Sequence, residues 1–245
     1  MMQNTAQEFI TRLNLLQSDD ELKKIQRYFK SDKAEYSESD IFIGVRMGLV
    51  FDLAKEFMNM ELPEIEKLLE SPVHEVRVGG VSIMDFQARS KKTPADRKKE
   101  LFDLYIRRHD RINNWDLVDR AAIYVVGSYL FDKPRDILYK LAISDNIWER
   151  RTAIVSTGYF IKQGEIIDTF TIAEILMNDI EDLIHKAAGG WLRHAGGSKH
   201  RRELLAFLDK HAATMPRTML RYAIEHLDKE EKEYYMGLRK AAPIS

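Results

Sequence analysis

Cysteine is absent from this chain, and glycine and proline are scarce, with 12 and 6 residues among 245. Without cysteine there is no disulfide framework, so nothing in the sequence requires an oxidising compartment. No apolar stretch reaches the roughly 18 residues that a membrane-spanning helix needs. Residues Met1 to Thr5 also lack the basic start and apolar block of a signal peptide. We therefore expect a cytoplasmic protein without membrane contact.

The composition is that of a folded protein, with 44% apolar and 31% charged residues. The length permits one large domain or two small ones. A formal charge of -1 hides basic clusters at residues 91–92, 98–99, 107–108, 150–151 and 199–202. Because a near-neutral protein can carry a local basic face, the net charge neither demonstrates nor excludes a polyanionic partner.

Helical patterns dominate the chain. Apolar residues recur with a helical period in windows such as 41–57, 101–107 and 204–208, and few segments alternate as a strand would. Chain breakers fall between these windows, for example at Pro63, Pro94, Gly164 and Pro216. The sequence therefore predicts an all-α fold.

A weak internal repeat accompanies the helices, in which a basic residue is followed two positions later by a small one. Its copies are Arg77/Gly79, Arg120/Ala122, Arg151/Ala153, Lys186/Ala188 and Arg221/Ala223. The spacing suits helix pairs of the HEAT or armadillo type, with the small residue allowing close packing and its basic neighbour facing the concave side. Basic-x-small is also a common helical pattern, so chance similarity stays open. We expect one continuous domain, residues 1–245, that forms an α-α superhelix (solenoid).

The segment 113–119 places an aromatic ring and a carboxylate one helical turn apart. With Asn114 as the N-cap, Trp115 and Asp119 become i and i+4 neighbours at the edge of an apolar stripe. Asp116 lies in the first turn, where a carboxylate favours the positive end of the helix dipole. Taken alone, the pair is compatible with a groove wall that carries chemistry or with a core tryptophan beside a surface aspartate.

Three segments in order carry a family resemblance: W-D-L-V-D at 115–119, S-D-N-I-W-E-R-R-T-A at 144–153, and K-A-A-G-G-W-L-R at 186–193. They resemble the AlkD-like DNA alkylation-repair glycosylases. The similarity covers roughly residues 20–225, and Phe42-Ile43-Gly44-Val45 resembles an earlier motif of that family.

This resemblance implies a HEAT-like solenoid that binds duplex DNA in a basic concave groove and hydrolyses the N-glycosidic bond of alkylated purines. It further implies a monomer that needs no cofactor or metal. Asp119 would be the catalytic carboxylate, and Trp115 the aromatic wall against the deoxyribose. The residues that it implies to contact DNA are Arg151, Arg193 and Tyr28. We expect further DNA contacts from Arg46, Trp191 and Lys199.

The chemistry of such a substrate explains why one carboxylate is enough. A purine alkylated at N3 or N7 is already cationic, so it leaves without a proton from a general acid. Positive charge then develops on the sugar, where Asp119 could stabilise it and position the attacking water. The ring face of Trp115 offers negative charge to the same cationic sugar.

Two departures from the family pattern affect the expected site. Gly190 stands where the family has a tryptophan, and Trp191 follows it, about 100° further round the helix. Arg46 stands where one type of family member has a glutamine. A non-catalytic HEAT-like module that binds structured DNA or a protein is therefore the alternative.

Two other patterns are weak. His185 and His194 are nine positions apart and have no spaced carboxylate partner that would suggest a metal site. Gly196-Gly197-Ser198-Lys199 lacks the full spacing of a phosphate loop, and we interpret it as a helix stop followed by a cap.

Overall fold

The computed structural model describes residues 4–29, 40–197 and 199–238, except for the side chains of residues 28 and 29. Throughout this part of the chain the regular structure is helical, apart from one isolated parallel bridge between Ile41 and Val73. The helices are α1 (Ala6–Asn14), α2 (Asp19–Phe29), α3 (Met47–Glu56), α4 (Leu62–Leu69), α5 (His74–Arg89), α6 (Ala95–Arg107), α7 (Trp115–Ala122), the π-helix η1 (Ile123–Gly127), α8 (Ser128–Leu130), α9 (Asp136–Ala142), α10 (Ile147–Lys162), α11 (Ile167–Leu176), α12 (Asp182–Ala195), α13 (Arg201–His211), α14 (Arg217–Ala223) and α15 (Lys229–Gly237). The predicted all-α class is confirmed.

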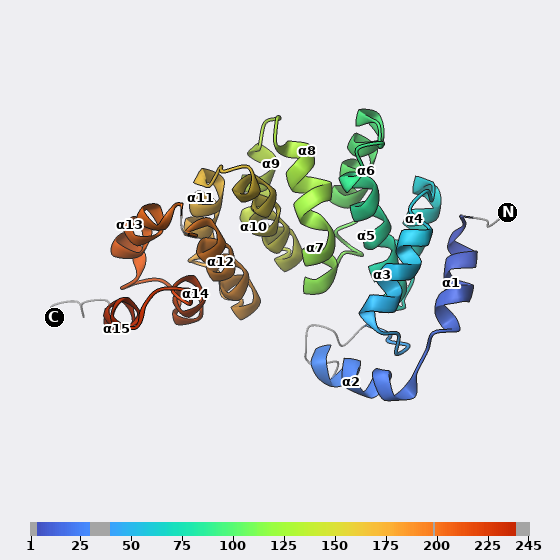
Figure 1. Cartoon of the computed structure of the whole chain (residues 1–245), viewed down its shortest axis with the longest axis horizontal. Helices are drawn as coiled ribbons and strands as arrows, with labels where there is room; N and C mark the ends of the chain where they lie inside the picture. Colours follow the sequence, from blue (N-terminus) through green and yellow to red (C-terminus); the bar gives the residue numbers. More distant parts are fainter. Residues whose placement is uncertain (1–3, 30–39, 198, 239–245) are drawn as a thin grey trace. The chain divides into compact units, whose positions relative to one another are not determined.

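The chain divides into two compact units, residues 1–129 and 130–245. In the first unit α5 is central, since it packs against α3, α4, α6 and α7 (Figure 1). Nearly every side chain of α5 is buried, Phe86 and Arg89 being the exceptions. The single continuous domain that we expect from the sequence stays a prediction.

Close helix packing in the first unit depends on a small residue of the predicted repeat. A Cβ atom added at Gly79 would lie 2.3 Å from Cζ of Phe9, so the ring rests directly on the α5 backbone. The basic partner in the repeat behaves differently from the prediction. Arg77 is almost fully buried and pairs with Asp40, because its position on α5 is surrounded by other helices. The expectation that the basic residue of the repeat faces the concave side is wrong for Arg77, which is buried.

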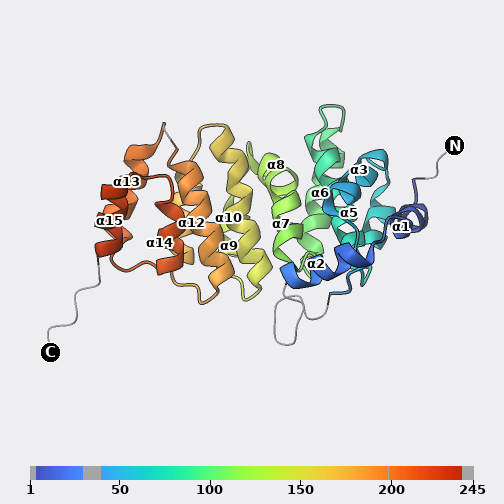
Figure 2. The same ribbon diagram turned by 60° about the horizontal axis from the view of Figure 1, so that its bottom comes forward.

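In the second unit α10 packs against α9, α11 and α12, and α12 packs against α14 (Figure 2). Small residues again mark the close contacts. A Cβ atom at Gly189 would lie 2.3 Å from the backbone oxygen of Met219. Gly189 therefore lets α14 approach the backbone of α12.

Several predicted breakers mark helix boundaries. Pro94 and Pro216 are the N-caps of α6 and α14, and Gly164 follows α10 with a φ of 85°. Pro63 differs because it lies inside the first turn of α4, where a missing N–H does no harm. The helical period over 41–57 was misleading in its first part, since α3 begins only at Met47.

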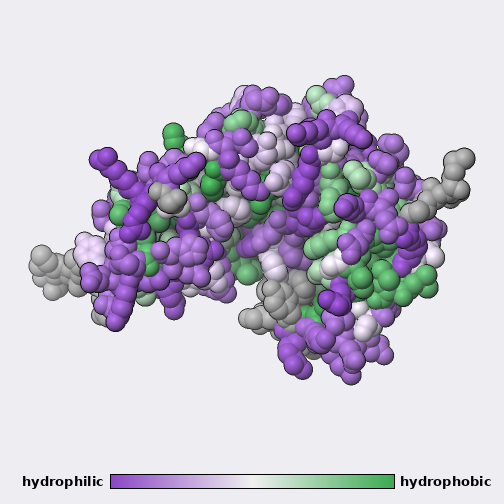
Figure 3. Space-filling view, viewed as in Figure 1, coloured by the Kyte–Doolittle hydropathy of each residue, from purple (hydrophilic) through white to green (hydrophobic). Residues whose placement is uncertain are grey.

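The described helices include none that is long and apolar enough to span a membrane. Hydrophilic residues cover most of the face in view, with scattered hydrophobic patches (Figure 3). Among the large apolar side chains that remain exposed are Leu15, Ile143 and Ile180. Isolated exposed residues of this kind are normal on a folded protein.

Candidate functional site

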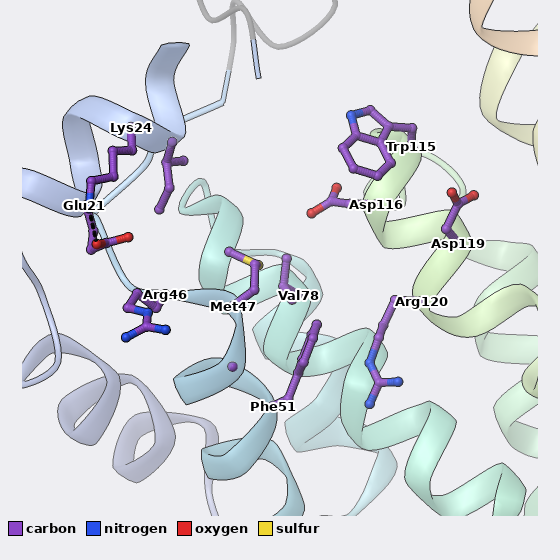
Figure 4. Close-up of a pocket in the computed structure, with 12 residues that line it drawn as sticks. Glu21, Lys24, Arg46, Met47, Phe51, Val78, Trp115, Asp116, Asp119 and Arg120 are labelled. Carbon is purple, nitrogen blue, oxygen red and sulfur yellow. Dashed lines mark hydrogen bonds and ion pairs between the residues drawn. The ribbon is translucent and has the colours of Figure 1, made fainter. Parts of the chain in front are cut away.

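The first unit contains a cavity of about 750 Å³ that lies between α2, the start of α3, α5 and α7 (Figure 4). Its lining combines an apolar floor with charged side chains of both signs. The lining residues are Glu21, Lys24, Ile25, Arg46, Met47, Gly48, Phe51, Val78, Trp115, Asp116, Asp119 and Arg120. The two residues predicted to be catalytic therefore line one cavity, and Arg46 lies in its wall with them.

Helix α7 supplies Trp115 and Asp119 as the sequence predicts. Asn114 is the N-cap, and its side-chain oxygen accepts a hydrogen bond from the backbone N–H of Trp115 at 2.8 Å. The predicted apolar stripe of Val118, Ala121, Ala122 and Val125 is buried. Burial of this stripe leaves Asp119 exposed and Trp115 partly exposed. The helix continues beyond Ala122 as the π-helix η1, which the sequence pattern does not indicate.

The opposite wall of the cavity depends on the non-helical segment before α3. The buried carboxylate of Glu75 accepts hydrogen bonds from the backbone N–H groups of Ile43, Gly44 and Val45 at 3.1, 2.9 and 3.3 Å. Gly44 has a φ of 80°, and a Cβ atom there would lie 2.4 Å from the oxygen of Ser18. This close approach positions α2, whose Lys24 side chain lies across the cavity from Trp115 (Figure 4).

Cations in the cavity have different surroundings. Arg46 is exposed, and Lys24 pairs with Glu21 at 2.7 Å. Arg120 is held more firmly, since it donates to Ser82 at 2.9 Å and pairs with the buried carboxylate of Asp85 at 2.9 Å. Among the described lining residues, Arg46 is thus the cation with the greatest freedom to meet an anionic ligand, whereas Arg120 has a structural role.

Asp116 connects the cavity to a buried polar cluster that the sequence did not reveal. Its Oδ2 lies 2.8 Å from Nε2 of His74, a side chain that is fully buried. Nδ1 of His74 lies 3.5 Å from Asp40, which also pairs with Arg77. Asp116 therefore has a buried cationic partner in addition to its place near the helix dipole.

Protonation of His74 follows from these contacts. Burial by itself lowers the pKa of His74, but the carboxylates of Asp116 and Asp40 outweigh burial and raise the pKa to about 9. For Asp40 burial acts in the opposite direction and raises the pKa. Hydrogen bonds and charge from His74 and Arg77 outweigh burial and hold the pKa of Asp40 below its usual value. At neutral pH the cluster is therefore an imidazolium between two carboxylates.

A signal for this cluster does exist in the sequence. His74, Glu75 and Arg77 interrupt the apolar run Val73 to Val81, which packs inside the unit. Buried groups that can be charged need partners, so polar residues within such a run predict a polar network. What the sequence cannot supply is the identity of the partners, since Asp40 and Asp116 are distant along the chain.

Four of the residues expected to contact DNA belong to the second unit. Arg151 is 8% exposed, and it donates to the backbone oxygen of Leu183 at 3.0 Å. Arg193 pairs with Glu225, whereas Lys199 is exposed. Trp191 packs on α10, since a Cβ atom added at Gly158 would lie 2.5 Å from its ring. Their roles in binding DNA stay predictions, as does that of Tyr28, whose side chain lies outside the described residues.

The two histidines considered as metal ligands contact backbone oxygens instead. His185 lies 2.8 Å from the oxygen of Asp179, and His194 lies 2.7 Å from that of Gly190. Within the described ranges there is no group of three or more His, Asp or Glu side chains that could hold a metal ion. Gly190 borders open space, with no neighbouring atom within 4 Å of an added Cβ.

Fold and cavity together define an all-helical protein whose candidate site combines a tryptophan, two carboxylates on one helix, and cations on the facing wall. Residues 9–227 match the family described as DNA alkylation repair enzyme, and the chain belongs to that family. Its role is accordingly in DNA repair, with DNA as the substrate.

A solved structure has a similar fold. It is titled "Predicted DNA alkylation repair enzyme from Enterococcus faecalis", with a TM-score of 0.69 and 15% sequence identity. The similarity covers 87% of this chain and 97% of the other. A comparison with curated proteins gave no match.

Proposed function

We propose that one copy of this protein binds duplex DNA and hydrolyses the N-glycosidic bond of purines alkylated at N3 or N7. The observation that supports this most is that Trp115 and Asp119 line the same cavity, one helical turn apart on α7. An aromatic face and a carboxylate are the two groups that stabilise a cationic sugar.

Asp119 acts on the sugar and not on the base. Because the alkylated purine is already cationic, it departs as a neutral base and takes no proton from the protein. Positive charge remains on the deoxyribose, and the carboxylate of Asp119 stabilises it electrostatically. The same carboxylate orients a water molecule, which adds to the anomeric carbon and releases a proton to the solvent to give the abasic sugar.

The other groups of the cavity serve binding. The face of Trp115 packs against the deoxyribose and adds a cation–π attraction as charge develops. Arg46 supplies a planar guanidinium suited to a phosphate of the same strand. In the second unit, Lys199 contacts the backbone of the duplex, with Arg151, Arg193 and Trp191 as further contacts.

The test is release of 7-methylguanine and 3-methyladenine from methylated duplex DNA by the wild type and by Asp119→Asn. Asparagine keeps the size of the side chain and removes its charge, so we expect base release to fall about 10²–10³-fold while DNA affinity is retained. Asp103→Asn is the matched control, since Asp103 lies on α6 and pairs with Lys99. This control should release bases at the wild-type rate.

Two results would contradict the proposal. Base release by Asp119→Asn at the wild-type rate would show that the carboxylate has no catalytic role. No release by the wild type, with DNA binding intact, would instead favour the non-catalytic binding module, and the open space beside Gly190 would then mark an incomplete site.

A further inference from the structure

The buried cluster around His74 has no part in the chemistry proposed above. It consists of Asp40, His74, Arg77 and Asn114 together with Asp116 of the cavity wall. Burying charged groups costs free energy unless each has a partner. Packing alone therefore does not explain why five polar side chains lie together at the start of α7.

Hydrogen bonds connect the cluster to the first turn of α7 at two points. On one side Asp40 accepts a hydrogen bond from Nδ2 of Asn114 at 2.8 Å, and Oδ1 of Asn114 accepts from the N–H of Trp115. On the other side Asp116 contacts His74 at 2.8 Å and accepts from the N–H of Leu117 at 2.9 Å. Both paths lead from His74 or its partner Asp40 to backbone N–H groups at the start of α7.

Trp115 is the first residue of this helix, and Asp119 follows one turn later. A shift of the first turn would move both side chains relative to a bound sugar. Misplacement of catalytic groups by about 1 Å costs on the order of 100-fold in rate. The position of the first turn would therefore affect the reaction rate, although His74 itself is buried away from the cavity.

We propose that His74 is a positioning residue: as an imidazolium held between Asp40 and Asp116, it fixes the first turn of α7 and so aligns Trp115 and Asp119 with the deoxyribose. The inference rests on the proposed function, because it assigns these two residues to one reaction.

If His74 fixes α7 in this way, the rate of base release depends on the protonation of His74. The charged groups that face His74 are Asp116 from α7 and Asp40 from the segment before α3, with Arg77 beyond Asp40 on its own helix. The ring of Phe42 covers the imidazole with centroids 4.9 Å apart. The pKa of His74 is raised to about 9, so the ring loses its charge, and with it one anchor of α7, as the pH rises through 9.

Two variants with an amide side chain at position 74 distinguish the contact with Asp116 from the contact with Asp40. In His74→Gln the side-chain Nε2 can take the place of the ring Nε2 and still donate to Asp116. In His74→Asn the shorter amide takes the place of Nδ1, so it reaches toward Asp40 and loses Asp116. We expect base release at pH 7.5 to fall on the order of 10–100-fold in His74→Asn and by less in His74→Gln. His109→Gln is the control for a buried histidine, because His109 lies just after α6 and contacts the oxygen of Ile106.

The measurements are base release between pH 7 and 10, thermal unfolding, and the indole N–H resonance of Trp115 by NMR. For the wild type we expect release to fall with an apparent pKa of about 9, a step that both His74 variants lack and His109→Gln keeps. Any pH effect on the substrate is common to all four proteins. Equal, wild-type activity and pH profiles in both His74 variants would overturn the proposal.

The NMR measurement separates this inference from the proposed function. If the wild type releases no base at any pH, the glycosylase proposal fails, and the resonance of Trp115 still tests the anchor. A shift of that resonance as His74 titrates, absent in His74→Asn, would support the positioning role. A resonance that stays fixed through the titration would overturn it.

Discussion

The buried carboxylate of Glu75 accepts a hydrogen bond from the backbone N–H of Gly44 at 2.9 Å, and this contact joins the central helix α5 to the cavity wall. Gly44 in turn lies against Ser18 and Leu22, at the start of α2. The side of the cavity formed by α2 is therefore positioned through one carboxylate and one glycine.

Replacing Gly44 with alanine should destabilise the protein and disturb the cavity. The φ of 80° is strained for any residue with a Cβ, and that Cβ would lie 2.4 Å from the Ser18 oxygen. We expect a loss of roughly 2–4 kcal/mol in the free energy of unfolding, from strain plus the steric clash. Urea unfolding measures it.

Gly164→Ala is the matched control for Gly44→Ala. Its φ is 85°, but nothing lies within 4 Å of the added Cβ, so only the backbone strain of about 1–2 kcal/mol remains. Equal losses in the two variants would show that the contact with α2 contributes nothing.

Gly158 and Gly190 should respond to alanine in opposite directions. A Cβ at Gly158 would meet the Trp191 ring at 2.5 Å, whereas one at Gly190 meets nothing within 4 Å. We expect Gly158→Ala to cost about 1–3 kcal/mol and to change the tryptophan emission. Gly190→Ala should stabilise the protein by roughly 0.5–1 kcal/mol, because alanine suits a helix interior better. Chemical unfolding followed by fluorescence measures both changes. Wild-type stability of Gly158→Ala would contradict the packing described for Trp191, and destabilisation by Gly190→Ala would contradict the open space beside that residue.

Stability should fall at alkaline pH because of His74. Its pKa is raised from the unfolded value of 6.5 to about 9, so the folded state holds the proton more tightly. The stabilisation is complete below pH 6.5 and is lost as the pH rises through 9. The decrease in the free energy of unfolding should be on the order of 3 kcal/mol. Urea unfolding of the wild type and of His74→Gln from pH 6 to 10 measures this decrease. The same dependence of the unfolding free energy on pH in both proteins would refute the prediction.

Lys199 should contribute to DNA affinity without affecting the rate of base release from bound DNA. If its ammonium group pairs with a phosphate, Lys199→Ala weakens binding to all sequences alike and reduces the slope of log affinity against log salt by about 1. Fluorescence anisotropy between 50 and 200 mM salt, roughly the range over which such contacts show, is the measurement. Lys140→Ala, an exposed lysine of α9, is the control, and equal slopes for both variants would remove Lys199 from the interface.

Local features were predictable where one helix suffices. The N-cap role of Asn114, the buried stripe of α7 and the common face of Trp115 and Asp119 follow from helical geometry alone. Helix boundaries at Pro94, Pro216 and Gly164 follow from the backbone limits of those residues. Each of these predictions involves groups within about one or two turns of chain.

Contacts between distant segments were not predictable in this way. The sequence favoured a helix from residue 41, yet Glu75 holds residues 43–45 in a non-helical conformation by accepting hydrogen bonds from their N–H groups. Arg77 carried a repeat pattern that predicted a place on the concave side, and the structure buries it against Asp40. In both cases tertiary packing outweighs local preference, because the partner is about 30 residues away or more.

The sequence by itself determined that this protein is helical, that it carries the motifs of a DNA alkylation repair enzyme, and that one helix presents Trp115 beside Asp119. Only the tertiary structure decided what surrounds that helix: the wall formed by α2 and Arg46, and the buried His74 that joins Asp116 to Asp40. The reason is physical. Helical periodicity is a property of neighbouring residues, whereas a cavity and a buried charge network exist only once segments far apart in the chain exclude water together.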